Sequence, residues 1–590
     1  MRARAPGILL AFFVALPVFS GDALASDDAT RIGREIYVHG RLPSGVPLRA
    51  TRGGEALEGR AAACIQCHRG SGLGQVEGEF AAPPVSGKAL FGPARSVIVT
   101  MDRVRGKAMN VSHEPYSQSD FANLVRGGTR PDGRALHELM PRYALDEASL
   151  ASLAAYLRTL SDAWSPGAFR DRVRFATVIT PEVSAKRRKA FLDTLRAAVA
   201  RKNANTMPGK RHMVSAAEFA MVTERKWELD VWELEGAPET WAAQLDARYA
   251  SAPVFAVLSG LSESDWTPVH GFCERERVPC WFPSVRTLPD VAGDGAFGLY
   301  FHAGVSLEAG LLARHFLEQA QNDRPLRIVQ MFEPGVAGRI AADAFRKAVA
   351  QSGILLEDRV LQGNAADALH TLSGSLRPRD ALLLWMGSDA LTALARVPAP
   401  ASPVYFSALM SGSDGVSVPM AWRQRASVVY PYELPSRRAN NLAYFRRWLA
   451  QSGVPLADEA LQSEVYFSVT YLADTLSEML DNLHRDYLVE RAETMLSRRE
   501  SRKAEDQARD SQMLRRFAPR APAGGAAPGS PGTAVHAASA VLGSSEGTTI
   551  YPALGLGPGQ RFASKGGYVI GLPALLASEG DSAAQWITNR

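Results

Sequence analysis

Two cysteines and a histidine stand together near the amino end of the chain, in the stretch AAACIQCHRG at residues 61–70. Cys64 and Cys67 are three positions apart, and His68 follows directly. Such a group is typical of half a zinc site, of a redox disulfide, or of haem attachment through two thioether bonds. A zinc site needs further ligands, and the next cysteine lies beyond residue 270. The spacing therefore predicts haem c with its iron as the cofactor, held by Cys64 and Cys67 and ligated by His68.

A second axial ligand is expected on the other face of the iron. Met140 precedes a proline and a predicted helix, and a methionine sulfur in this position suits electron transfer. We therefore predict Met140 as the second iron ligand. A five-coordinate iron with peroxidase-type activity stays open, and the rival ligands are Met101, Met109, His113 and His137.

Two helices must position these groups. One is predicted over residues 147–160, with Asp146 as its N-cap and leucines at helical spacing along one face. The other is predicted over residues 27–40, where Gly33 permits close approach of a second backbone and Tyr37 can reach the region of Tyr156. We expect these two helices to pack together.

Residues 28–162 resemble the class I monohaem cytochrome c family. The resemblance rests on Gly-x-x-x-Tyr in the first helix, on CIQCH, on PPVSGKALF at 83–91, and on Met140-Pro-Arg-Tyr before the last helix. It implies an all-α cytochrome c domain over about residues 26–165, one-electron transfer, and a periplasmic redox partner protein. The segment between Tyr37 and Cys64 is longer than usual in that family, and we expect it to form a hairpin.

After residue 170 the chain alternates short apolar runs with amphipathic helices, which is typical of parallel strands joined by crossovers. Eight such runs predict two doubly wound lobes over residues 171–485. This region resembles the type I periplasmic binding proteins of the branched-chain amino acid binding family, chiefly in VLSGLSESDWTPVHGFCERERVPCWFPS and in RIVQMFEPGVAGRIAADAFRKA.

That resemblance implies a small-molecule, amino-acid-like ligand between the lobes, at the carboxyl ends of the strands. The residues it implies as ligand contacts are Gly260, Ser262, Ser284, Glu333 and Ser388. Each has a plainer interpretation as a turn or a helix cap. In addition, Glu263 and Asp265 would repel an anionic ligand if they pointed inward.

Cys273 and Cys280 are the other two cysteines. Export permits a disulfide between them, and we predict that bridge in preference to a metal site with His270.

Residues 486–545 predict a charged, solvated helix followed by a Pro/Gly/Ala-rich linker. Residues 546–590 predict short β segments that return to the two-lobed domain.

The first residues predict the compartment. Arg2 and Arg4 precede an apolar run that ends before Ala23-Leu24-Ala25, so we expect residues 1–25 to be a signal peptide and the protein to lie in the periplasm. The run is shorter than the ~20 residues that span a bilayer.

The formal net charge of +5 is spread over 590 residues without a basic block, which argues against a nucleic-acid partner.

These patterns predict a periplasmic c-type cytochrome for electron transfer with an attached small-molecule-binding domain. The alternative is a solute-binding receptor of an ABC transporter or sensor in which the redox haem is ancillary. An enzyme is not predicted, since the chain contains neither an H-E-x-x-H zinc helix nor a phosphate-binding P-loop.

Overall fold

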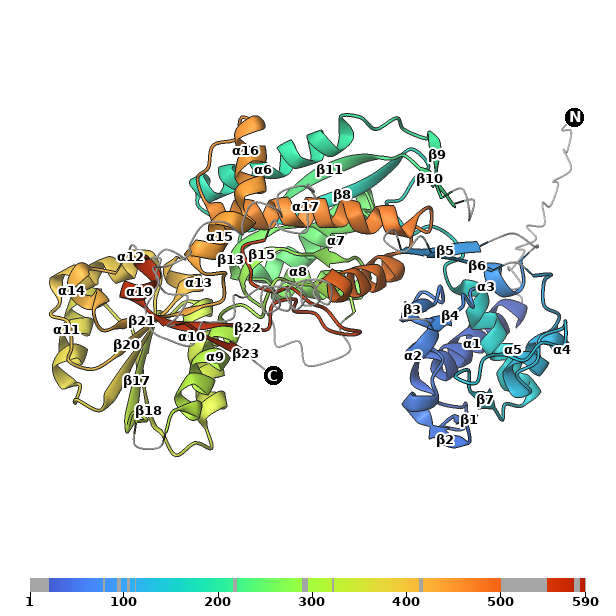
Figure 1. The fold of residues 1–590 in the computed structure, drawn as a ribbon, viewed down its shortest axis with the longest axis horizontal. Helices are drawn as coiled ribbons and strands as arrows, with labels where there is room; N and C mark the ends of the chain where they lie inside the picture. The colour runs from blue at the N-terminus through green and yellow to red at the C-terminus, as the bar shows by residue number, and fades with distance from the viewer. Residues whose placement is uncertain are drawn as a thin grey trace, which may run out of the picture. The chain divides into compact units, whose positions relative to one another are not determined.

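The chain forms two compact units in a computed structural model (Figure 1). One unit contains Met1–Met101 and Lys107–Ala163, and the other contains Asp102–Gly106 and Trp164–Arg590. The structure describes residues 21–77, 80–92, 97–102, 107–111, 113–215, 220–288, 296–320, 323–412, 418–499, 549–577 and 584–588. Most of the predicted signal peptide therefore lies outside the described residues, as does most of the predicted linker. No described helix is long and apolar enough to cross a bilayer.

The first unit is built around two packed helices, α1 and α5. Asp146 caps α5, since its side chain accepts a hydrogen bond from the backbone N–H of Ser149 at 2.7 Å. A π-helical turn, Glu35–His39, extends α1 and buries Ile36 and Tyr37. The helices of this unit are α1 (Gly21–Arg34), α2 (Ile65–His68), α3 (Gly87–Leu90), α4 (Gln118–Arg126) and α5 (Glu147–Thr159).

Gly33 allows the close approach of α1 and α5. A Cβ atom at this position would lie 2.0 Å from the backbone oxygen of Ser152. One turn further on, the rings of Tyr37 and Tyr156 pack with their centroids 5.4 Å apart. The predicted helix pair is therefore present, and a glycine is required where the two backbones meet.

The prediction that this unit is all-α is wrong. The long segment before Cys64 forms an antiparallel hairpin of β1 (Arg49–Arg52) and β2 (Glu55–Glu58), which turns at two glycines with positive φ, Gly53 and Gly54. Strand β1 also pairs with β7 (Arg142–Tyr143) just after Met140. Two further hairpins consist of β3 (Gln75–Glu77) with β4 (Phe80–Ala82), and of β5 (Val97–Asp102) with β6 (Lys107–Val111).

The second unit begins with a lobe whose sheet is parallel throughout. Its order is β15-β13-β8-β12-β14-β16, and β11 pairs with β8. The strands are β8 (Arg172–Ile179), β11 (Lys226–Glu233), β12 (Ala256–Leu258), β13 (Leu261–Asp265), β14 (Cys280–Trp281), β15 (Ser284–Thr287) and β16 (Gly298–Leu299). The helices are α6 (Ala185–Asn203), α7 (Trp241–Ser251), α8 (Thr267–Arg275) and α17 (Glu459–Met479). A separate hairpin pairs β9 (Arg211–Ser215) with β10 (Ala220–Thr223).

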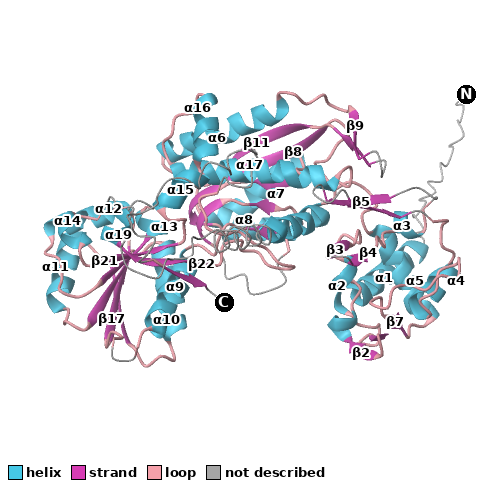
Figure 2. Ribbon diagram, in the orientation of Figure 1, coloured by secondary structure: helices cyan, strands magenta, loops and turns pink. Residues whose placement is uncertain are grey.

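The second lobe contains a seven-stranded sheet in the order β18-β17-β19-β20-β21-β22-β23. Its first five strands are parallel: β18 (Leu355–Val360), β17 (Arg327–Phe332), β19 (Asp380–Trp385), β20 (Val404–Ser407) and β21 (Ala426–Tyr430). The last two, β22 (Gly566–Gly571) and β23 (Gln585–Thr588), are antiparallel. The sheet packs among α9 (Val305–Glu318), α10 (Val336–Val349), α11 (Ala365–Ser375), α12 (Ser388–Leu391), α13 (Ala408–Ser411), α14 (Met420–Arg423) and α19 (Leu572–Leu576) (Figure 2). The chain returns toward the first lobe through α15 (Pro435–Asn441) and α16 (Ala443–Gln451).

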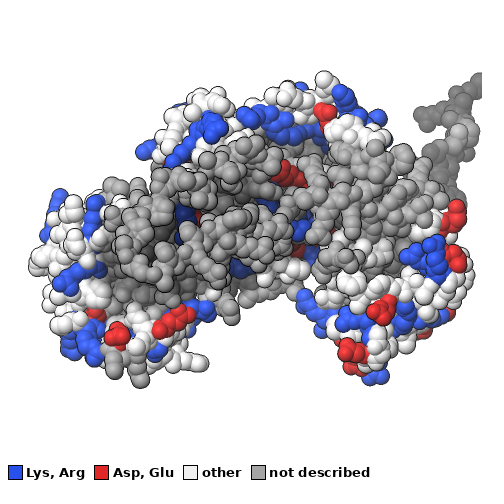
Figure 3. All heavy atoms as spheres, in the orientation of Figure 1, with Lys and Arg blue, Asp and Glu red and all other residues white. Residues whose placement is uncertain are grey.

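The predicted two-lobed α/β architecture is therefore present, and the sheet of its second lobe also includes β22 and β23 from beyond residue 485. The core strands are the predicted apolar runs: Phe175 and Ala176 of β8 are fully buried, and so are Ile328 and Val329 of β17. Charged side chains of both signs lie scattered over the visible face of the described residues, without a single basic patch (Figure 3).

The helix at residues 485–499 is packed rather than solvated. Tyr487, Leu488 and Ala492 are buried, and its charged residues are paired. Arg491 bonds to Glu478, and the buried Glu493 binds Arg561 at 2.8 Å. For this described part of the chain the prediction of a solvated helix is wrong, because charges such as Arg491 and Glu493 have partners far away in the sequence, which a sequence pattern does not reveal.

We predict that Gly33→Ala loosens the α1–α5 pair. The added methyl group meets backbone atoms that cannot move independently of α5, so the expected loss is about 1–3 kcal/mol. Hydrogen exchange of the full chain, read by mass spectrometry on peptides from α1 and α5, measures the loss of protection. The matched control is Gly374→Ala in α11, where a Cβ atom meets nothing within 4 Å. Unchanged protection of α1 and α5 would contradict this account.

Candidate functional site

Three of the predicted ligand contacts lie at one edge of the first lobe. Gly260 follows β12 in a buried turn, where its φ is +139° and a Cβ atom would lie 2.8 Å from the ring of Trp266. The Ser262 hydroxyl accepts a hydrogen bond from Thr180 at 3.0 Å, so it serves the lobe itself. Ser284 begins β15 and lies beside Glu464 of α17, whose pKa its hydroxyl helps to lower.

The other two predicted contacts lie together at the edge of the second lobe. Glu333 directly follows β17, and its carboxylate accepts a hydrogen bond from the backbone N–H of Gly387 at 2.8 Å. Ser388 is the next residue and begins α12. Helix α10, which starts shortly after Glu333, contacts both β13 and β15 of the first lobe. The structure therefore brings the two groups of predicted residues to the region where the lobes meet.

Glu263 and Asp265, the acids next to the predicted site, each bind a partner within the first lobe. Glu263 pairs with Arg187 at 2.9 Å, and the same guanidinium pairs with Asp458 at 3.2 Å. Asp265 accepts a hydrogen bond from the backbone N–H of Thr267 at 2.9 Å, at the start of α8. The pairing with Arg187 offsets the repulsion of an anionic ligand that was expected from Glu263.

Sequence analysis missed a buried carboxyl group, Glu308, on α9. Its side chain accepts hydrogen bonds from the backbone N–H of Leu409 at 3.0 Å and from the hydroxyl of Ser407 at the end of β20. Burial raises the pKa of Glu308 to about 8, against the lowering effect of these hydrogen bonds. At neutral pH this group is mostly uncharged. The signal in the sequence was a single acid within the apolar helix VSLEAGLLARHF.

A second buried carboxyl group, Glu464, was missed as well. The hydroxyl of Tyr551 donates a hydrogen bond to it, and burial raises its pKa to about 7. The ring of Tyr551 stacks on Phe301 at 5.4 Å and packs against Tyr432 at 5.6 Å. Because these partners lie 87 to 250 positions from Tyr551, no local pattern in the sequence marks them.

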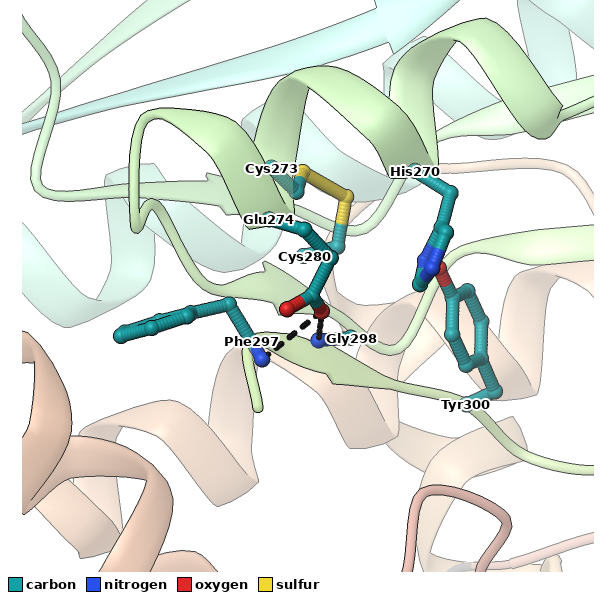
Figure 4. Close-up of a disulfide and its surroundings, with 7 residues drawn as sticks. All are labelled: His270, Cys273, Glu274, Cys280, Phe297, Gly298 and Tyr300. Atoms are coloured by element: carbon teal, nitrogen blue, oxygen red, sulfur yellow. Dashed lines mark hydrogen bonds between the residues drawn. A yellow bond between two sulfur atoms is a disulfide. The ribbon is translucent and has the colours of Figure 1, made fainter. Parts of the chain in front are cut away.

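The structure bonds Cys273 of α8 to Cys280 of β14, with their Cα atoms 5.9 Å apart (Figure 4). His270 points away from the sulfur atoms and bonds through Nδ1 to the Tyr300 hydroxyl at 2.7 Å. The Glu274 carboxylate accepts hydrogen bonds from three successive backbone N–H groups at residues 296–298, at 2.8 to 2.9 Å. These contacts hold α8 against the strands beside it, so the cluster has a structural role.

The first unit contains a separate, apolar cavity. Its empty volume is about 510 Å³, counted with the space open to solvent. Three of the predicted cofactor residues, Cys64, His68 and Met140, lie in its wall, and Cys67 is on the same short helix as His68. The other lining residues are Ile36, Tyr37, Leu48, Val85, Leu90, Phe121, Leu124, Val125, Tyr143, Leu145, Leu153 and Leu157.

The side chains of this cavity fit a porphyrin better than a zinc ion. His68 bonds through Nδ1 to the backbone oxygen of Pro83 at 2.8 Å, which leaves Nε2 as an acceptor for a metal. Burial lowers the pKa of His68, so the imidazole is neutral. Burial also raises the pKa of Cys64 to about 12, which disfavours the thiolate that zinc requires.

Two of the rival ligands, His113 and His137, do not line the cavity. His113 stacks on Tyr116 with ring centroids 4.0 Å apart, and His137 is exposed and packs against Phe80. Met101 and Met109 lie in β5 and β6, whose side chains are outside the described part of the structure. Of the candidates whose side chains are described, Met140 is the one in the cavity wall.

Known proteins resemble this chain only in fold. No protein-family model matches it, and no curated protein matches it. Among solved structures, an ABC transporter substrate-binding protein from Desulfitobacterium hafniense in complex with Leu is 18% identical, with 55% of this chain and 89% of that chain covered and a TM-score of 0.39. A branched chain amino acid ABC transporter from Thermus thermophilus with bound valine is 8% identical, with 55% and 84% covered and a TM-score of 0.42. A fatty acid ABC transporter substrate-binding protein from Thermomonospora curvata is 14% identical, with 56% and 83% covered and a TM-score of 0.40.

The expectation that this protein is characterised by metal binding, iron and electron transport is corrected. Among the described residues, no group of three or more His, Cys, Asp and Glu side chains could hold a metal ion. A porphyrin brings its own nitrogen ligands, so haem attachment at Cys64 and Cys67 stays a prediction.

We predict that Glu308→Gln changes how stability depends on pH. The folded-state pKa of about 8 lies above the ordinary glutamate value of 4.5, so between these values the folded chain keeps a proton that the unfolded chain loses. The wild type therefore loses stability as pH rises through this window, by at most about 1.4 kcal/mol per pH unit from this group. The variant does not titrate here and should gain relative to the wild type.

Urea unfolding at pH 5, 6.5 and 8 measures this difference. Glu318→Gln, at an exposed position of the same helix, is the control and should keep a constant difference from the wild type. A Glu308→Gln difference that is also constant with pH would show that Glu308 is ionised in the folded protein.

Proposed function

We propose that this chain is an exported, periplasmic solute-binding receptor of the type I class, with a small molecule bound between its lobes and an ancillary haem on the first unit. The observation that supports the receptor function is that the sheets of the two lobes meet at edges that carry polar side chains. Ligands of open α/β folds bind beyond the carboxyl ends of the strands. Helix α10, which follows Glu333, touches the strands that carry Ser262 and Ser284.

The chain crosses between the lobes at three places, which suits a hinge. The crossings are residues 300–304, 431–434 and 549–565. An aromatic residue from each crossing contributes to one cluster, namely Phe301, Tyr432 and Tyr551. Closure about such a hinge buries a solute that contacts both lobes, and a solute with more contacts in the closed state shifts the equilibrium toward it.

The receptor function predicts that a small solute stabilises the protein. The full exported chain is titrated with single amino acids and with small carboxylic acids, and its melting temperature is recorded for each. A solute at 100 times its Kd should add about 2.7 kcal/mol to the free energy of unfolding. Small-angle X-ray scattering with the same solute should show a smaller radius of gyration.

Glu333→Gln should reduce the stabilisation by the solute, because it removes a carboxylate from the edge of the second lobe. The control is Asp343→Asn, on an exposed position of α10, which should behave as the wild type. If no solute stabilises the protein, the receptor function is wrong.

We propose separately that haem c is attached at Cys64 and Cys67, and that His68 and Met140 would hold its iron. The apolar cavity supports this proposal, since three of the four residues lie in its wall and His68 is held with Nε2 unprotonated. The chain's own residues would exclude water from the ring and fix the imidazole through Pro83. When bound, the haem supplies an iron that changes its oxidation state reversibly.

Haem attachment predicts a pigment that acidified organic solvent does not extract. Cys64→Ala combined with Cys67→Ala should abolish it. Met140→Ala should remove the weak near-infrared band of methionine ligation in the ferric protein. The control is His137→Ala, three residues away and outside the cavity wall, which should leave the spectrum unchanged. An extractable pigment or a colourless protein would refute the attachment and leave the receptor function untouched.

A further inference from the structure

Met140 reaches the cavity of the first unit from a loop, residues 127–141, which joins α4 to β7. The cavity residues on either side of this loop belong to regular elements: Leu124 and Val125 lie in α4, and Tyr143 lies in β7. Helical and strand hydrogen bonds hold those residues in place. The position of the Met140 thioether depends instead on how the loop itself is held.

Hydrogen bonds within the loop fix its shape. The backbone N–H of Leu136 donates to the backbone oxygen of Gly128 at 2.7 Å, so the two sides of the loop meet at this point. The backbone N–H of Met140 donates to the backbone oxygen of His137 at 3.0 Å, which makes a tight turn. Because these bonds join one part of the loop to another, they do not fix the loop against the cavity.

The half-buried side chain of Arg142 links the loop to a strand. Its backbone is held in β7, where Arg142 pairs with Thr51 of β1. From this strand the guanidinium donates hydrogen bonds to the backbone oxygen of Met140 and, at 3.3 Å, to that of Leu136. Gly128 packs against the same group, since a Cβ atom there would lie 1.8 Å from the Arg142 Nε. One side chain therefore contacts both sides of the loop and the residue that lines the cavity.

We infer that Arg142 is a positioning residue, which holds the loop so that the Met140 sulfur stays in the cavity wall; its role toward an iron ligand rests on the proposed haem attachment. The guanidinium is planar and its N–H groups have fixed directions, so it sets the two carbonyl groups relative to each other. Hydrogen bonds from a charged donor are also stronger than neutral ones. Gly128 is required because a side chain there would occupy the place of the guanidinium.

Competition with free imidazole measures the hold on Met140 in the pigmented protein. Imidazole binds the ferric iron only in molecules whose Met140 sulfur has left it, so its apparent affinity rises with that fraction. Arg142→Gln removes the charge-assisted bonds to the loop and should tighten imidazole binding by roughly 3- to 30-fold. Arg142→Lys keeps the charge without the fork and should show a smaller change. The matched control is Arg134→Gln in the same loop, whose exposed side chain pairs with Asp132 at 2.6 Å and which should leave the affinity unchanged.

Oxidation of Met140 tests the same inference whether or not haem is attached. The full exported chain is treated with dilute chloramine-T, and sulfoxide formation at Met140 is followed by peptide mass spectrometry. Met140 should oxidise roughly 3- to 30-fold faster in Arg142→Gln than in the wild type, because the loop leaves the cavity more often. The exposed Met207 of the second unit is the internal reference, and its rate should not change.

Hydrogen exchange of peptides from α1 and α5 separates this role from a general loss of stability, and their protection should stay as in the wild type. Arg142→Lys supplies the same comparisons if Arg142→Gln does not fold. An unchanged Met140 oxidation rate, an unchanged imidazole affinity in the pigmented protein, or an equal loss of protection in α1 and α5 overturns the role of Arg142. A colourless wild type overturns the haem attachment, and the oxidation rates then decide the role of Arg142 alone.

Discussion

The structure of the second unit depends on one constraint: polar and charged groups lie where the two lobes close over the ends of their strands, and there is little water to solvate them. Glu308 and Glu464 respond by holding protons, as their raised pKa values of about 8 and about 7 indicate. Arg187 responds by pairing with two acids. The charge of Arg286 lies in the fields of the same two acids, Glu263 and Asp458. The same desolvation therefore stabilises the neutral carboxyl groups.

Much of the two-lobed fold was predictable, because its strands are buried on both faces and appear in the sequence as apolar runs. The runs at 326–332 and 380–387 contain β17 and β19, which pair along their full length. The polar residues after these strands, Glu333 and Ser388, were placed at the correct edge by the same reasoning. The raised pKa of Glu308 was not predictable in this way. It depends on the burial of this side chain beside Ser407 and Leu409, 99 and 101 positions away, and that is a property of the folded chain.

In the first unit, local sequence patterns predicted the helix pair correctly, whereas the predicted all-α class was wrong. Cys64, His68 and the helix pair around Gly33 were found because their spacing and small size act locally. The all-α class failed because the segment before Cys64 carries Gly53 and Gly54, which close a hairpin. That hairpin pairs with Arg142–Tyr143 and so positions the residues just after Met140. The departure from the helical pattern thus helps to build the cavity wall.

The two sites differ in the kind of molecule they can hold. The cavity of the first unit is lined by aliphatic and aromatic side chains around one neutral imidazole, so it suits a large apolar group fixed by covalent bonds. The region where the lobes meet carries polar side chains instead, among them Ser262, Ser284 and Glu333. Under the proposed function, the exchangeable ligand therefore belongs to the second unit and the covalently bound one to the first.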